Sequence, residues 1–157
     1  AADWTGPGTG LAGVKLAHKI DVVGKAVAAH WGRKDDPLGI LQCLGGREIA
    51  AMAGVILAAR YTRVPVLVDG FVASAAAAIL HALDERALEH CVAAHVSAES
   101  GHRKLLERLG LTPLFDFGMR LGEGSGAGLA ISILRAAAEC HAGMATFEQA
   151  GVTNKDG

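Results

Sequence analysis

The sequence predicts an α/β fold with a parallel, Rossmann-like sheet flanked by alanine-rich helices. A short, β-branched segment at 64–69 and a second strand candidate at 91–96 are each followed by a small residue and then by a helical segment. Repetition of strand, small residue and helix is typical of βαβ units, whose strands pair in parallel. Hydrophobic residues make up 51% of the 157-residue chain and charged residues 20%, which indicates one folded domain with its own core.

The amino-terminal part of the chain is expected to be helical after a glycine-rich loop at 5–10. Apolar positions between 11 and 31 alternate with charged ones at helical spacing, which predicts an amphipathic helix. Asp36-Pro37 can start a short helix with proline at its first position, and Gly45-Gly46 are expected to end it. Segment 47–60 is apolar nearly all round, so we expect a buried helix there.

The rest of the chain should hold the sheet. The strand at 64–69 leads through Gly70 into a helix at 71–83, and the strand at 91–96 leads through Ser97 into a helix near 103–109. A second glycine-rich loop, 121–128, precedes a helix at 129–140 that we expect to be buried, and 153–157 are expected to form a frayed tail.

Composition argues against several classes of partner. Fifteen basic and sixteen acidic residues leave a net charge of −1, whereas nucleic-acid binding usually needs a basic face. Cys43, Cys91 and Cys140 are far apart and no CxxC occurs, so we expect free thiols and no zinc site. The longest apolar run, 49–59, falls short of the roughly 20 residues of a membrane span. With no signal peptide visible, we expect a soluble cytoplasmic protein without a membrane partner.

Glu123 stands in the middle of the second glycine-rich loop. Glycines on both sides let the backbone approach a ligand or adopt positive φ, and a carboxylate there could take a proton from a nitrogen heterocycle. Two other interpretations remain open. The acid could sit at a helix start that the dipole favours, or the loop could be a dinucleotide fingerprint, because Gly122, Gly124 and Ala127 loosely fit GxGxxG/A. The missing strand before the loop and the repulsion between Glu123 and a pyrophosphate weaken the fingerprint.

The ends of the two predicted strands are the other candidate positions, because ligands of parallel sheets bind beyond the carboxyl ends of strands. Gly70 is an ordinary turn residue that could also let a phosphate or ribose touch the amides of a helix start. Ser97 could cap the next helix, bind a phosphate, or both. Cys91 and His95 would lie about 13 Å apart on a strand, which is too far for one metal ion. His102 is expected to make a local structural contact.

Three stretches together carry a resemblance to a known family. They read LGGREIAAMAG at 44–54, VPVLVDGF at 64–71, and HVSAESGH at 95–102 with LGEGSGA at 121–127. In this order and spacing, over about residues 5 to 152, the chain resembles nicotinate-nucleotide:dimethylbenzimidazole phosphoribosyltransferase, an enzyme of cobalamin biosynthesis. The resemblance implies transfer of 5-phosphoribose from nicotinate mononucleotide to 5,6-dimethylbenzimidazole, with inversion at the anomeric carbon. It also implies a homodimer, no cofactor, and a subunit that combines the sheet with a small helical domain.

The same resemblance implies roles for single residues. Glu123 matches the family's general base, Gly70 and Ser97 match nucleotide contacts, and Leu121 would line the benzimidazole pocket. Lys19 and Glu48 match further positions near the substrates.

The sequence departs from the family in two ways. Pro7 replaces an arginine in the first glycine-rich loop, which puts a charge role there in doubt. The family's chains also carry a further amino-terminal half, so 1–157 resembles a carboxy-terminal α/β unit, with 141–157 contributing to the helical domain. Much of the base pocket would lie in the other half, which leaves dimethylbenzimidazole, adenine and a phenol open as acceptors. A dinucleotide-binding half-domain of an oxidoreductase and a noncatalytic interaction domain remain the alternatives.

Overall fold

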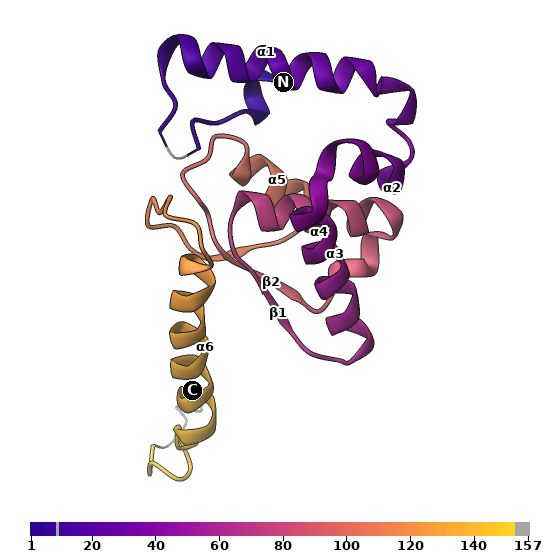
Figure 1. The fold of residues 1–157 in the computed structure, drawn as a ribbon. Coiled ribbons are helices and arrows are strands. Elements are labelled where there is room, and N and C mark those ends of the chain that lie inside the picture. The colour runs from indigo at the N-terminus through magenta and orange to yellow at the C-terminus, as the bar shows by residue number, and fades with distance from the viewer. Residues whose placement is uncertain (9, 153–157) are drawn as a thin grey trace, which may run out of the picture.

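The centre of the molecule is a sheet of three parallel strands, seen in a computed structural model that describes residues 1–8 and 10–152 (Figure 1). Strands β1 (Val66–Val68), β2 (Cys91–His95) and β3 (Pro113–Phe115) lie side by side in that order. The parallel sheet and its first two strands are therefore as predicted. The third strand was not predicted, because three residues beginning with a proline are too few to show a strand period.

Helices cover the sheet on both faces. Helices α3 (Gly46–Tyr61), α4 (Phe71–Leu83) and α5 (His102–Leu109), with the short 3₁₀ helix η4 (Glu85–Leu88), lie on one side of the strands, and α6 (Ser125–Gly143) lies on the other (Figure 1). The larger core is built mostly from small aliphatic side chains: Ala53, Ile56, Val68, Ala76, Ala77, Leu80, Leu88, Cys91 and Leu109. A smaller cluster of Ala94, Phe115 and Ala130 joins the sheet to α6.

The amino-terminal segment folds largely as predicted. After η1 (Ala2–Trp4), helix α1 (Gly13–Ala29) forms across the expected amphipathic stretch and is followed by η2 (Trp31–Arg33). Asp36 caps α2 (Pro37–Ile40) by accepting a hydrogen bond from the Gly39 amide at 2.9 Å, and proline occupies the first helical position. Gly45-Gly46 end this first helical segment as predicted, because the π-helical turn η3 (Leu41–Gly45) stops at Gly46, whose φ of 77° and ψ of 175° are not helical, and α3 begins there.

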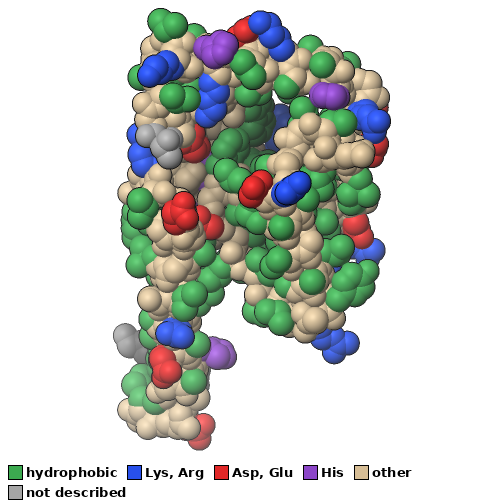
Figure 2. Space-filling view, viewed as in Figure 1, with side chains coloured by type: hydrophobic (Ala, Val, Ile, Leu, Met, Phe, Trp, Pro, Cys, Tyr) green, Lys and Arg blue, Asp and Glu red, His purple; other side chains and the backbone are tan. Residues whose placement is uncertain are grey.

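Two helices that were expected to be buried are largely exposed. Only Ala53 and Ile56 of α3 are buried, and Val55 is 66% exposed. Only Gly126 and Ala130 of α6 are buried, and hydrophobic side chains of both helices lie at the surface (Figure 2). The prediction was wrong because an apolar helix is buried only where another part of the chain packs against it. The composition of α3 and α6 does not show whether such a neighbour exists. Helix α3 has such a surface only where it packs on α4, and α6 only near its first turn.

The helical segments α2, η3 and α3 follow one another without an intervening loop from Pro37 to Tyr61, which the sequence did not predict. The run is 25 residues long and contains an 18-residue window with a mean hydropathy of 1.5, which would suffice, by length and composition alone, to cross a membrane. The sequence analysis considered only the apolar run 49–59 within α3, which is too short to cross a membrane, and did not include the helical turns before it. Ala53 and Ile56 of this run pack in the main core of the α/β domain.

The sheet explains where a ligand can bind. All three strands run in the same direction in sequential order, so their carboxyl ends meet at one edge. The described strands contain no reversal of that order, and the likeness to a Rossmann fold stays a prediction. Helix α6 ends at Gly143, and the proposed tail at 153–157 lies outside the described residues, so the assignment of 141–157 to a helical domain also stays a prediction.

Candidate functional site

A cleft of about 760 Å³ opens at the carboxyl edge of the sheet, between α1 and the body of the domain. In Figure 2 the surface is hollowed below α1, where hydrophobic side chains are visible inside. The lining comes from five parts of the chain: the first loop (Trp4, Thr5, Gly6, Gly8), α1 (Lys19, Val23), α3 (Met52), the ends of β1 and β2 with the residues that follow them (Asp69 to Ala73, His95, Ser97, Glu99), and the second loop (Arg120 to Gly124).

The end of β1 connects the sheet to two helices. Gly70 is the N-cap residue of α4, and a Cβ atom there would meet His95 at 3.6 Å and Ser97 at 3.7 Å. These are ordinary contact distances, so glycine keeps the cleft open at this point without being a steric necessity. Asp69 accepts a hydrogen bond from the Ala127 amide at 2.8 Å, in the first turn of α6. A carboxylate therefore already satisfies the amino-terminal end of α6.

The end of β2 contributes two buried polar side chains to the cleft. His95 is 3% exposed and Ser97 is 8% exposed. Within the described part of the chain, the Ser97 hydroxyl and the His95 Nδ1 atom have no hydrogen-bond partner. Buried polar groups are normally paired, and an unpaired one beside a cleft is a place where a ligand or water can bind. The alternative of a helix cap is wrong for Ser97, because Gly101 is the N-cap residue of α5.

His102 makes the structural contact that was expected of it, in a buried network beneath the cleft. Its Nδ1 accepts a hydrogen bond from the Ser97 backbone amide at 2.8 Å, and its Nε2 lies 2.9 Å from the Ser74 hydroxyl. Because Nδ1 accepts, the neutral ring carries its proton on Nε2 and donates it to Ser74. Burial, with a smaller contribution from nearby His95, lowers the pKa of His102 to about 4.

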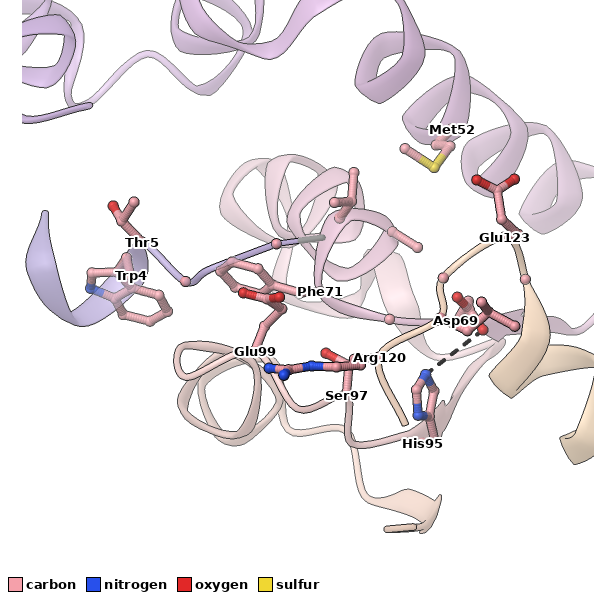
Figure 3. Close-up of a pocket in the computed structure, with 18 of the residues that line it drawn as sticks. Trp4, Thr5, Met52, Asp69, Phe71, His95, Ser97, Glu99, Arg120 and Glu123 are labelled. Carbon is pink, nitrogen blue, oxygen red and sulfur yellow. Dashed lines mark ion pairs between the residues drawn. The ribbon is translucent and has the colours of Figure 1, made fainter. Parts of the chain in front are cut away.

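The second loop places Glu123 on the rim of the cleft. Gly122, Glu123 and Gly124 have φ of 77°, 55° and 73°, so three successive residues adopt the left-handed conformation. This region favours glycine, and a glutamate there carries a conformational cost of about 1–2 kcal/mol. The side chain is exposed and points away from Asp69 and His95 (Figure 3). No hydrogen bond or ion pair to another described residue holds it.

The glycines of this loop serve different purposes. Gly122 and Gly124 supply positive φ, whereas Gly126 is needed for close approach, since a Cβ atom there would lie 2.1 Å from Cδ2 of the His95 ring. Gly128 meets neither condition. The helix-start interpretation of Glu123 is disfavoured, because Asp69 occupies that role. The same carboxylate would repel a pyrophosphate at this helix end, and β3 ends several residues before the loop, which disfavours the dinucleotide fingerprint.

The first loop approaches the cleft from the opposite side. Lys19 of α1 donates a hydrogen bond to the Gly6 carbonyl at 2.8 Å, which attaches this helix to the loop. Its ammonium group is partly buried and lies near Gly8, where a Cβ atom would be 3.6 Å from Nζ. Pro7, between these two glycines, carries no charge where the family has an arginine. The positive charge on this side of the cleft therefore comes from Lys19. Arg120 provides a second cation from the other loop.

Five of the six residues singled out from the sequence line this cleft: Lys19, Gly70, Ser97, Leu121 and Glu123. Glu48 is not among the lining residues and lies exposed in the first turn of α3, so its role near the substrates stays a prediction. Asp69 and His95 were missed as site residues. Asp69 ends the first predicted strand and His95 is the last residue but one of the second, so the strand-end rule that selected Gly70 and Ser97 points to their immediate surroundings.

Metal chemistry has no support in the described residues, which contain no cluster of three or more possible ligands. Cys91 and His95 lie at opposite ends of the five-residue strand β2. Burial raises the pKa of the Cys91 thiol to about 11, so this cysteine is a protonated core residue and a poor nucleophile.

Comparison with known proteins gives one consistent family. Residues 1–152 match the family model described as phosphoribosyltransferase. Nicotinate-nucleotide–dimethylbenzimidazole phosphoribosyltransferases are 63% identical in Brucella canis and 64% identical in Rhizobium leguminosarum bv. trifolii, over 98% and 99% of this chain. The crystal structure of CobT from Thermus thermophilus superposes with a TM-score of 0.86 at 40% identity, over 96% of this chain and 44% of that one. The chain spans only 45–46% of the length of these two curated relatives.

Proposed function

The chain belongs to the phosphoribosyltransferase family, and we propose that it carries the general base and nucleotide contacts for phosphoribosyl transfer from nicotinate mononucleotide to 5,6-dimethylbenzimidazole. The products would be α-ribazole 5′-phosphate and nicotinate. The observation that carries the proposal is the convergence of Glu123, Gly70, Ser97 and Lys19 on one cleft at the carboxyl edge of the sheet. The names of relatives that are 63–64% identical support the choice of substrates.

Glu123 would act as the general base. One ring nitrogen of the benzimidazole attacks the anomeric carbon of the ribose, and the N–H on the other nitrogen passes its proton to the Glu123 carboxylate. The bond from the anomeric carbon to nicotinate breaks, and its electron pair stays on the pyridine nitrogen. The left-handed backbone at Glu123 supports this role, because strain of this kind is concentrated at functional positions.

The remaining lining residues would bind the substrates. The Ser97 hydroxyl, which is buried and has no described partner, would hydrogen-bond the phosphate or ribose of the nucleotide. The amides that follow Gly70 begin α4 and favour an anionic group. Lys19 would supply positive charge from the facing wall, and Leu121, which is exposed at the rim, would contact the benzimidazole. Glu48 would require a rearrangement to reach the substrates.

The proposal extends to the setting of the enzyme. We propose that the matched region is the carboxy-terminal half of a longer cytoplasmic enzyme that works as a homodimer, without nucleic acid, membrane or cofactor. The exposed apolar side chains of α3 and α6 support a further protein surface packed against them. Light scattering of the full-length protein would give twice the chain mass if the homodimer is correct.

A chimera provides the direct test. The 153 residues of this chain that match the Brucella canis relative replace their counterparts in that protein, and nicotinate release is measured with dimethylbenzimidazole as acceptor. We expect the chimera to be active and Glu123→Gln to lower kcat by about 10²–10⁴-fold. Glu107→Gln makes the same chemical change on the exposed side of α5, outside the cleft, and should stay within about twofold of the unmodified chimera. A loss of less than about tenfold for Glu123→Gln contradicts the general base.

A further inference from the structure

His95 occupies an unusual position for a polar residue, enclosed at the end of β2 between two apolar surfaces. Its ring stacks on Phe115 of β3 with centroids 5.7 Å apart and an interplanar angle of 28°. The backbone of Gly126 covers it from the side of α6, so closely that no Cβ atom could fit. Of the ring nitrogens, Nε2 faces the Asp69 carboxylate, with 3.8 Å between Nε2 and Oδ1 (Figure 3).

Asp69 connects this ring to the second loop. The carboxylate oxygen that faces His95 is the same Oδ1 that accepts the Ala127 amide at 2.8 Å. The first turn of α6 is thus held at two adjacent residues, by packing of Gly126 on His95 and by the hydrogen bond from Ala127 to Asp69. Glu123 precedes this turn by two residues, and the loop bonds from Ser125 to Gly122 and from Gly128 to Gly124 transmit its position.

We propose that His95 is a positioning residue for the reaction, which acts with Asp69 to set the placement of the Glu123 loop over the cleft. The inference rests on the proposed function, since it assigns His95 a part in presenting the general base. His95 itself need not touch the reacting atoms. Its task is to hold one carboxylate orientation, so that the first turn of α6, and with it Glu123, has one position relative to β1 and β2.

The chemistry of the ring fits this task better than an apolar side chain would. A mostly buried carboxylate has lost much of its hydration and needs polar partners, and Asp69 has the Ala127 amide on one side and the imidazole on the other. The 3.8 Å separation lies within ion-pair reach but is longer than a hydrogen bond, so a small closing movement would complete the contact. The flat ring also leaves room for the Gly126 backbone, which a branched side chain would push away.

The test uses two isosteres of different reach in the chimera described above. The Gln amide nitrogen can reach the place of Nε2, whereas the Asn amide stops near Nδ1 and cannot contact Asp69. We expect His95→Asn to lower kcat by about tenfold to a hundredfold, with the KM for nicotinate mononucleotide changed by less than about threefold. His95→Gln should recover most of the lost kcat, because it restores a donor facing Asp69.

A double-mutant cycle with Glu123→Gln separates positioning from general loss of structure. If His95 acts through Glu123, His95→Asn should change the residual rate of the Glu123→Gln chimera by less than about twofold. An equal fall of kcat in both backgrounds overturns the inference, and so does a His95→Asn variant with full kcat. If His95→Asn does not fold, Asp69→Asn keeps the shape and the acceptor oxygen while removing the charge, and it should show the same pattern. An unmodified chimera that releases no nicotinate overturns the proposed function instead.

Discussion

The floor and the rim of the cleft are built in opposite ways. The floor consists of the lining residues His95 and Ser97 together with His102 and Gly126, which pack against them from outside the cleft, and all four are buried. The rim consists of Arg120, Leu121 and Glu123, all exposed and set on a loop. The floor is held by hydrogen bonds and close packing, whereas Glu123 is held only by the backbone of its own loop.

Two kinds of residue choice therefore meet at one site. Floor residues satisfy the packing of the fold, so changing them should alter stability, and at His95 and Ser97 the reaction as well. Rim residues can reduce local stability, since Glu123 adopts the left-handed conformation that favours glycine. Changing them should first alter activity. Four predictions test this division, beginning with the substitution that should have the greatest consequence.

The first prediction separates activity from stability at the rim. Glu123→Gly removes the base and the strained φ together, so kcat of the chimera should fall by about 10²-fold or more while the free energy of unfolding of the chain rises by about 1 kcal/mol. Arg63→Gly is the matched control, because Arg63 is the other non-glycine residue with positive φ among those described and lies outside the cleft. It should gain similar stability in urea unfolding with unchanged kcat. A destabilised Glu123→Gly chain would show that the rim is not under local strain.

The second prediction concerns the floor and pH. Because the folded-state pKa of His102 is about 4, against 6.5 for the unfolded chain, the unfolded state binds more protons between these values. Stability is therefore fully present above pH 6.5 and falls as pH decreases toward 4, by up to about 3 kcal/mol. His102→Gln should be less stable at neutral pH and should show a shallower decrease. His141→Gln, on the exposed part of α6, is the control and should keep the slope of the unmodified chain.

The third prediction compares two glycines of α6 that lie two residues apart. Gly126→Ala places a methyl group into the His95 ring and should destabilise the chain by about 1–3 kcal/mol. Gly128→Ala meets open space and should stabilise it by about 0.5–1 kcal/mol, because alanine is the better helix former. Thermal unfolding of both variants measures the difference. Equal effects would mean that the floor is less tightly packed than the structure indicates.

The mildest consequence is expected at Leu121. Its side chain is exposed at the rim, so Leu121→Ala should leave the free energy of unfolding within about 0.5 kcal/mol of the unmodified chain. If it contacts the benzimidazole, the KM for the acceptor in the chimera should rise by roughly tenfold while the KM for nicotinate mononucleotide stays the same. If only the KM for nicotinate mononucleotide changes, Leu121 contacts the nucleotide and not the benzimidazole, which contradicts the proposed role.

The sequence alone predicted much of the fold because the relevant signals are local. Helix α4 begins at Phe71 and ends at Leu83, as the glycine before it and the alanine-rich run predict, and β1 lies within the β-branched stretch 64–69. Burial was predicted poorly, because Val55 and its neighbours on α3 have the composition of a core without a surface to complete it. Strand β3 gave no local signal, since its pairing with β2 is what makes it a strand.

The candidate site also has features that follow from the sequence and features that arise only from tertiary packing. The type and spacing of its residues, above all Glu123 between two glycines and small residues after each strand, are properties of the sequence, because a turn that needs positive φ or close approach selects its residues locally. Only the packed chain, in contrast, brings the Ala127 amide to Asp69 and places His95 under Gly126. These partners are up to 58 positions apart in the chain, and no local pattern encodes a contact that arises only when β1, β2 and α6 meet at one edge.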